Sequence, residues 1–233
     1  MKQADVLKLL QAHQNERGIK NWIEMEQDSE YKSFGIGLTV LRKLAKEVGK
    51  NHELALQLWN SDCYDMKVLG VLIDEPKKIT REQMEAQVKD LDYGMMVHVF
   101  SACGAPVAKV NFIDEVADEW VKSDDSVKRR CAYGFIYELS KSTKKSAPDD
   151  DYFMKYIRHI DETYDNEDQS VHLSMGGALM GIGKRNLKLN QAALKVAQRI
   201  GAIPVESGKT QCEPMDISKH LTSNYLKKKF AKT

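Results

Sequence analysis

Apolar residues recur at intervals of three and four along most of the chain, which is the spacing of amphipathic α-helices. One arrangement occurs three times, beginning at Trp59, Trp120 and Tyr164. In each copy the aromatic residue stands seven residues before the first apolar position of a new helix. A pair of residues that can cap a helix lies between them, such as Ser123-Asp124 in the second copy. This repetition predicts an array of α-helical repeats.

The individual helices are predicted from the same periodicity at about residues 2–14, 21–27, 40–48 after a cap at Thr39, 52–60, 64–74, 93–103, 106–122, 127–137, 171–183 and 190–200. A further helix begins at the capping box that runs from Thr80 to Gln83. The stretch 93–103 is apolar apart from His98, which predicts a central helix packed on several sides. Four glycines within 171–183 indicate close contact with other backbone, because glycine inside a helix costs about 1 kcal/mol against alanine.

The composition also favours an all-α fold. Leucine, methionine, alanine, lysine and glutamate are abundant, and only five prolines interrupt them. A chain of 233 residues can bury a full core, and we expect one domain over residues 1–233. Residues from about 200 to 233 are expected to form an irregular C-terminal extension, with a basic tail at Lys227–Lys229 that frays.

The sequence indicates a cytoplasmic protein. It contains neither the run of roughly 18 apolar residues that a membrane span needs nor the apolar segment of a secretory signal at its start. The cysteines are widely spaced and form no CxxC pair; they are Cys63, Cys103, Cys131 and Cys212. This pattern predicts reduced thiols rather than disulfides or a metal site. We therefore expect a monomer with no metal, no cofactor and no membrane partner.

The formal net charge of +1 conceals an uneven distribution. Residues 169–233 contain eleven lysines and arginines and three acidic residues, a net charge of +8, so residues 1–168 carry −7. No acidic residue stands between Asp168 and Glu206, whereas Lys184 and Arg185 fall in that segment. Such segregation indicates a surface for a polyanion, with nucleic acid as the first choice. A solvated pair of basic helices would explain the same charges.

Four segments together resemble the AlkD-type family of DNA alkylation repair proteins. They are Gly37-Leu-Thr-Val-Leu-Arg-Lys-Leu-Ala-Lys46, Glu53-Leu-Ala-Leu-Gln-Leu-Trp59, Trp120-Val-Lys-Ser-Asp124 with Arg129-Arg130, and Gly181-Ile-Gly-Lys-Arg-Asn186. Their order and spacing cover about residues 35–200. The resemblance implies a solenoid of HEAT-like helix pairs whose concave basic face holds duplex DNA. It also implies a relation to glycosylases that remove cationic alkylated purines, such as 3-methyladenine and 7-methylguanine.

The residues that such glycosylases place around the lesion are only partly present. The family's Trp-Asp-x-x-Asp segment falls on residues 94–98, so that Gly94 replaces the tryptophan and His98 replaces the carboxylate. A second lesion-facing tryptophan falls on Gly177, whereas the family's arginine matches Arg130. An imidazole cannot supply the negative charge that stabilises an oxocarbenium-like transition state. The resemblance therefore leaves Arg130, His98 and Tyr93, which is adjacent to Gly94, as candidate catalytic residues.

These observations predict a DNA-binding protein that holds duplex, damaged or branched DNA and excises no base. The residues expected to contact DNA are Arg42, Lys43, Arg129, Arg130, Lys184 and Arg185. Most of these residues have a simpler interpretation: Arg130 could pair with Asp124 or Asp125, Arg42 and Lys43 could be solvated, and Lys184 and Arg185 could complement a helix dipole. The catalytic candidate His98 could likewise be a core histidine. Two other functions stay open, namely an alkylpurine glycosylase with a rebuilt site and, more weakly, a HEAT scaffold that binds proteins.

Overall fold

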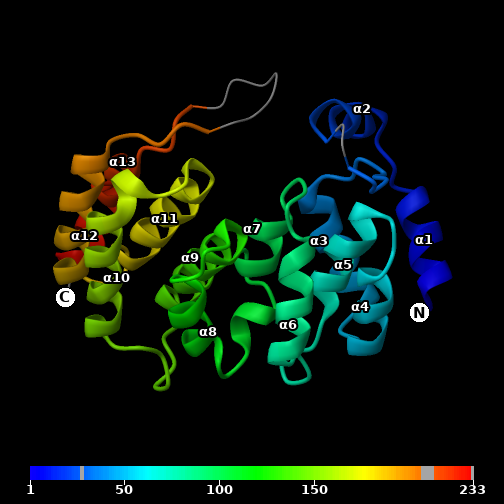
Figure 1. Ribbon diagram of the computed structural model, residues 1–233, viewed down its shortest axis with the longest axis horizontal. Coiled ribbons are helices and arrows are strands. Elements are labelled where there is room, and N and C mark those ends of the chain that lie inside the picture. The colour runs from blue at the N-terminus through cyan, green and yellow to red at the C-terminus, as the bar shows by residue number, and fades with distance from the viewer. Residues whose placement is uncertain (27–28, 206–212, 232–233) are drawn as a thin grey trace. The chain divides into compact units, whose positions relative to one another are not determined.

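The computed structural model describes residues 1–26, 29–205 and 213–231, and the fold is all-α as the sequence predicts (Figure 1). Its α-helices are α1 (Gln3–Gln11), α2 (Glu16–Met25), α3 (Leu38–Val48), α4 (His52–Trp59), α5 (Tyr64–Ile73), α6 (Arg81–Gln87), α7 (Met96–Ser101), α8 (Ile113–Trp120), α9 (Ser126–Ser140), α10 (Asp150–Thr163), α11 (Gln169–Ile182), α12 (Leu187–Ile200), α13 (Ile217–Leu221) and α14 (Asn224–Phe230). Short 3₁₀ turns are η1 (Val88–Asp90), η2 (Val107–Lys109) and η3 (Tyr164–Asn166). Within the described residues, β-pairing is limited to isolated bridges, Lys32 with Cys63 and Ile203 with Met215.

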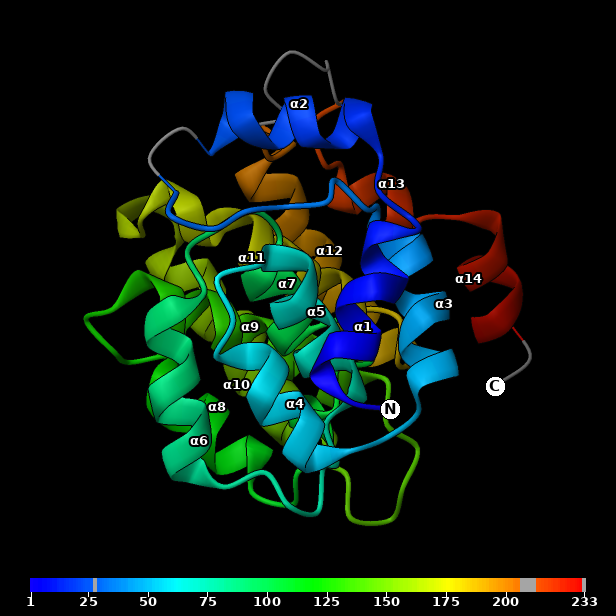
Figure 2. The same ribbon diagram turned by 90° about the vertical axis from the view of Figure 1, so that its right-hand side faces the viewer.

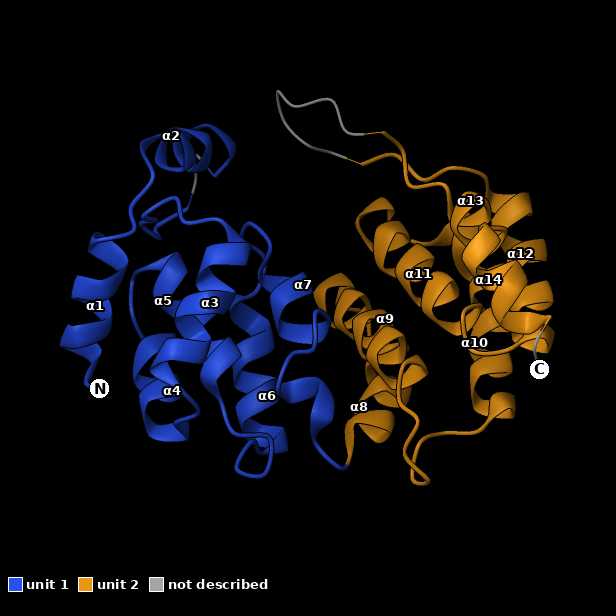
Figure 3. Ribbon diagram, turned by 180° about the vertical axis from the view of Figure 1, so that it is seen from behind, with its two compact units in different colours: residues 1–111 blue, residues 112–233 orange. Residues whose placement is uncertain are grey.

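The contacts within the chain divide it into two compact units, Met1–Asn111 and Phe112–Thr233 (Figure 3). Each unit has its own buried core. The sequence suggested one domain over residues 1–233, and that organisation stays a prediction, as does the concave basic face. None of the described helices is both long and apolar enough to span a bilayer.

In unit 1 (Met1–Asn111), α5 packs against both α3 and α4 (Figure 2). Eight of the ten residues of α5 are buried, which is why it carries almost no polar face. Gly70 makes the close approach to α4 possible. A Cβ atom at Gly70 would lie 2.8 Å from the carbonyl oxygen of Ala55 and 3.2 Å from the backbone nitrogen of Trp59.

The repeated helix pairs are present where the aromatic positions predict them. Trp59 and Trp120 end α4 and α8, each is buried, and a new helix follows within six residues. The caps lie slightly later than predicted. Asp125, rather than Ser123-Asp124, accepts the backbone N–H of Val127 and so caps α9.

Unit 2 (Phe112–Thr233) is built around α11, which lies beside α9 and also contacts α12 and α13 (Figure 1). The glycines explain these contacts. A Cβ atom at Gly181 would lie 2.5 Å from Ser140 Oγ, and one at Gly183 would lie 2.7 Å from Leu221 Cδ2. The glycines therefore allow close approach at these positions, but the neighbouring atoms belong to side chains and not to the backbone that the sequence predicted. At Gly177 no atom lies within 4 Å of such a Cβ, so there is no close approach.

The C-terminal extension is more ordered than the irregular segment expected from the sequence. Asp216 caps α13 by accepting the backbone N–H of Lys219, and Ile217 and Leu221 are buried. Leu226 of α14 is also buried. These three apolar residues are too few to show helical periodicity in the sequence, but each fills a space beside the core of unit 2. Residues 206–212, including Cys212, lie outside the described residues.

Several predicted helices have different bounds. The helix expected at 106–122 is divided into η2 and α8, because Val110 adopts an extended conformation. The helix expected at 21–27 begins earlier, at Glu16, where the side chain of Asn15 caps it. The third helix is capped by Gly37 rather than Thr39. The helix expected at 93–103 covers only Met96–Ser101, although its side chains are buried as predicted except at His98.

Candidate functional site

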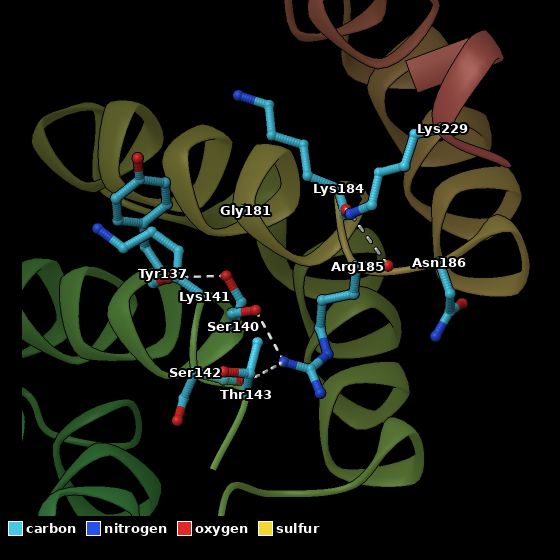
Figure 4. A pocket seen from close by; sticks show the side chains of 10 residues that line it. All are labelled: Tyr137, Ser140, Lys141, Ser142, Thr143, Gly181, Lys184, Arg185, Asn186 and Lys229. Atoms are coloured by element: carbon cyan, nitrogen blue, oxygen red, sulfur yellow. Dashed lines mark hydrogen bonds between the residues drawn. The ribbon is translucent and has the colours of Figure 1, made fainter. Parts of the chain in front are cut away.

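One pocket of about 380 Å³ lies in unit 2, where the end of α9, the loop between α11 and α12, and the last turn of α14 meet (Figure 4). It is lined by Tyr137, Ser140, Lys141, Ser142, Thr143, Gly181, Lys184, Arg185, Asn186 and Lys229. Four of these residues carry a positive charge and four carry a hydroxyl group. None of the lining residues that the structure describes carries a carboxylate, so the pocket attracts anions.

Arg185 connects the two loops that form this pocket (Figure 4). Its Nη1 donates hydrogen bonds to the carbonyl oxygens of Ser140 at 2.7 Å and of Ser142 at 3.3 Å. Its guanidinium carbon lies 4.3 Å from the ring centre of Phe153, and its Nε lies 3.9 Å from a carboxylate oxygen of Asp150. The side chain is only 20% exposed. Arg185 therefore fixes the loop that carries Lys184.

Lys184 is half-buried at the opening of the pocket, and removal from water lowers the pKa of its ammonium group from the ordinary value. The adjacent Asn186 caps α12 by accepting the backbone N–H of Leu189 at 2.9 Å. The first N–H groups of a helix add positive potential at such a position. Lysine and helix start together add positive potential to this loop, and the carboxylate of Asp150, which accepts a hydrogen bond from Asn186 Nδ2 at 2.7 Å, offsets part of it.

Lys229 of α14 closes another side of the pocket. Its Nζ donates to the carbonyl oxygen of Lys184 at 2.6 Å and approaches that of Arg185 at 3.4 Å. On the α9 side, Lys141 lies 4.6 Å from the ring centre of Tyr137 and pairs with Glu138. The contact from Lys229 therefore fastens the C-terminal helix to the predicted basic loop.

The other basic site predicted in unit 2 lies at the start of α9. Arg129 makes a bidentate contact with Glu167, with Nη2 2.8 Å from Oε1 and Nε 3.0 Å from Oε2. Its Nη1 donates to the carbonyl oxygen of Ser123 at 2.7 Å. The Arg129 and Glu167 side chains are only 17% and 10% exposed, so the pair is internal. Arg130 is half-buried, and its charge contributes to lowering the pKa of Asp168, after hydrogen bonds from Ser170.

In unit 1, aromatic residues pack around Gly94, the position at which the resemblance predicts a tryptophan. A Cβ atom at Gly94 would lie 3.1 Å from both Trp22 and Tyr64, whose ring centres are 4.4 Å apart. Gly94 also has φ +51°, a conformation that residues with side chains rarely adopt. Glu26 accepts the backbone N–H of Gly94 at 2.8 Å, which holds the end of α2 against this segment. Tyr93 packs edge-on against Tyr31.

His98 is exposed, which corrects the alternative interpretation of it as a core histidine. Its Nε2 lies 2.6 Å from Sγ of Cys103. Cys103 has φ +59°, and its carbonyl oxygen accepts a hydrogen bond from Arg42 at 3.3 Å. Arg42 is therefore part of this corner of unit 1, whereas the neighbouring Lys43 is exposed.

The structure brings Lys184 and Arg185 into one site, and it places Tyr93 and His98 on the same short segment of unit 1. Arg130, the third candidate catalytic residue, belongs to unit 2. Sequence reasoning missed Lys141 and Lys229 in the pocket and Trp22 beside Gly94. Only the run of lysines at 227–229 gave any signal in the sequence. Among the described residues there is no group of three or more potential metal ligands.

Comparison with known proteins finds a family model and relatives that match most of the chain. The model of the family described as DNA alkylation repair enzyme matches residues 6–205. The uncharacterized protein Lin0241 of Listeria innocua is 24% identical over 216 residues, which cover 89% of this chain and 90% of that protein. The uncharacterized protein Lmo0209 of Listeria monocytogenes has the same identity and coverage.

One solved structure is similar over most of the chain. It is described as "A new family of proteins related to the HEAT-like repeat DNA glycosylases with affinity for branched DNA structures". It matches with a TM-score of 0.79 at 20% identity, and the match covers 95% of this chain and 92% of that chain. This likeness confirms the predicted HEAT-like helical repeat fold.

Proposed function

Because the chain belongs to the DNA alkylation repair enzyme family, we propose that it binds duplex, damaged or branched DNA and excises no base. The observation that carries this proposal is the cationic pocket beside α12, which no carboxylate lines among the described residues. DNA presents closely spaced phosphates, and lysines and helix starts placed along its backbone supply affinity without reading the sequence.

Within this proposal, the basic residues have different tasks. Lys184 presents its ammonium group to a phosphate, while Arg185 holds the loop through the Ser140 and Ser142 carbonyl oxygens. Arg129 stabilises the start of α9 through Glu167, and Arg130 beside it is a further candidate for contact with DNA. Arg42 and Lys43 are proposed contacts of unit 1.

The absence of base excision is supported by the three positions that differ from the glycosylases. Trp22 and Tyr64 would lie 3.1 Å from a Cβ at Gly94, so any side chain at that position requires these rings to move. His98 lies beside Cys103 and provides no carboxylate near a developing sugar cation. Gly177 faces open space and contributes no aromatic surface for a flipped base.

The similar solved structure adds support, because the protein it describes has affinity for branched DNA. That property does not require excision of a base. It is consistent with a fold in which phosphate contacts are kept and the lesion-contacting residues are replaced.

The proposal is tested by measuring binding and base release on the same methylated duplex. We expect binding that weakens steeply as salt rises, and no release of 3-methyladenine or 7-methylguanine. Lys184→Ala should lower affinity and reduce the slope of log K against log[salt] by about 0.9, the value for one lost phosphate contact. Lys195→Ala removes an equal charge from the exposed side of α12, outside the pocket, and should leave both quantities nearly unchanged.

A double variant, Arg130→Ala with Lys184→Ala, should weaken binding further than either change alone. Unchanged affinity in the double variant would rule out this DNA-binding surface. Release of free base by the wild-type protein would establish the glycosylase alternative instead. A protein that neither binds DNA nor releases base would refute the proposal and favour a scaffold for protein partners.

A further inference from the structure

The C-terminal helix α14 lies outside the region that the family model matches, which ends at residue 205. It is nevertheless part of the pocket, because Lys229 donates to the Lys184 carbonyl oxygen and lines the same cavity (Figure 4). Leu226 is buried and holds the helix against unit 2. The helix is therefore a fixed wall of the basic site.

One face of α14 combines an exposed aromatic ring with positive charge. Tyr225 is 74% exposed, the highest value among the exposed large apolar and aromatic residues of the described chain. Lys228 and Lys229 follow it by three and four residues, which places them next to it on the helix surface. No acidic residue occurs between 217 and 231, so the helices α13 and α14 themselves carry no carboxylate side chain.

A second exposed apolar side chain lies beside the pocket. Leu187, the first residue of α12, is 51% exposed and directly follows the pocket residue Asn186. Leu187 lies on α12 and Tyr225 lies on α14. Both helices adjoin the pocket, α12 through its cap Asn186 and α14 through Lys229. Exposed apolar surface next to lysines is the combination that contacts both the bases and the phosphates of an unpaired strand.

We propose that α14 and the start of α12 form a binding platform for unpaired nucleotides. Tyr225 stacks against an unpaired base, while Lys228 and Lys184 bind the phosphates on either side. This inference rests on the proposed DNA-binding function and names the part of the DNA that the C-terminal helix recognises, a single-stranded segment next to a duplex.

The chemistry of the platform distinguishes single-stranded from double-stranded DNA. In a continuous duplex each base face is covered by its neighbour, so an exposed ring at the protein surface gains nothing by stacking. In an overhang, gap or branch the base faces are open, and stacking on an aromatic side chain is tolerant of sequence. Lysines alone would favour both kinds of DNA equally. The aromatic ring therefore provides the preference.

The test compares the full-length wild-type protein with Tyr225→Ala and Tyr225→Phe by fluorescence anisotropy at one fixed salt concentration. The probes are a blunt duplex and a forked duplex of the same paired length with oligothymidine arms. We expect Tyr225→Ala to bind the forked probe about tenfold more weakly, as loss of one stacked base predicts, and the blunt probe within about twofold of wild type. Tyr225→Phe keeps the ring and should match the wild-type protein on both probes.

Lys228→Ala serves as a charge control and is measured at several salt concentrations. It should weaken binding to forked DNA and reduce the salt slope, without removing the aromatic preference. Equal losses on blunt and forked DNA for Tyr225→Ala, or no loss on either, would overturn the platform while leaving DNA binding intact. Failure of the wild-type protein to bind either probe would refute both proposals. Because Tyr225 is largely exposed, its substitution leaves the core of unit 2 unchanged.

Discussion

Substitution of Gly70 by alanine tests why glycine stands at this position. We attribute it to close packing between two helices and not to helix propensity. The added Cβ would lie 2.8 Å from the Ala55 carbonyl oxygen, about 0.6 Å short of an ordinary contact at 3.4 Å. Both of its closest neighbours are backbone atoms of α4, so neither can rotate away. The helix must shift instead. Overpacking of this kind costs about 3 kcal/mol, and the better helix propensity of alanine returns about 1 kcal/mol.

We therefore expect Gly70→Ala to lower the free energy of unfolding by about 2 kcal/mol and the Tm by about 4–8 °C. Gly177→Ala is the matched control, because its Cβ meets no atom within 4 Å and alanine gains about 0.5–1 kcal/mol in a helix. That variant should raise the Tm by about 2 °C. Differential scanning calorimetry measures both changes and separates the units if they unfold independently. A stabilised Gly70→Ala variant would refute the reasoning, since it would show that the two helices separate at no cost.

Three further predictions concern individual side chains. Arg129→Ala leaves the buried carboxylate of Glu167 without its main partner. It should therefore reduce the free energy of unfolding, measured in urea, by about 3 kcal/mol. In a Glu167→Gln background the same substitution should reduce it clearly less. Burial raises the pKa of the Tyr64 hydroxyl to about 12. The stabilisation that comes from this pKa shift is therefore complete below pH 10 and is lost as the pH rises to 12. Tyr64→Phe should flatten the pH dependence of the free energy of unfolding in that range. Burial raises the pKa of the Cys63 thiol to about 11. Iodoacetamide at pH 8 should therefore alkylate the half-buried Cys103 before Cys63. The opposite order, measured by mass spectrometry, would contradict the structure.

The parts of the fold that could be predicted from the sequence are those that short-range patterns determine. Trp59 and Trp120 mark helix ends because each is followed by cap residues and a new apolar face within a few positions. The resemblance to a family of DNA repair proteins added the HEAT-like arrangement. It also placed Lys184 and Arg185 on a loop beside a glycine-rich helix, where the structure has them.

Contacts between distant segments could not be predicted in this way. Gly94 indicated only a missing tryptophan, whereas the structure shows Trp22, more than 70 residues earlier in the chain, packed into the space beside it. The lysines at 227–229 suggested a frayed tail. In the structure Lys229 instead donates a hydrogen bond to the backbone of the α11–α12 loop, a contact of which the sequence gives no sign. Arg185 was predicted only as a DNA contact, and its hydrogen bonds to the Ser140 and Ser142 carbonyl oxygens are visible only in the structure.

The packing around Gly94 also limits how this protein could change over evolutionary time. A change of Gly94 to tryptophan cannot occur as a single neutral step, because its Cβ alone would lie 3.1 Å from Trp22 and Tyr64 and would strain a backbone at φ +51°. A smaller residue in place of Trp22 or Tyr64 would make room for it, but α2 would then lose the ring contact between them. The aromatic cluster therefore makes glycine at this position difficult to replace.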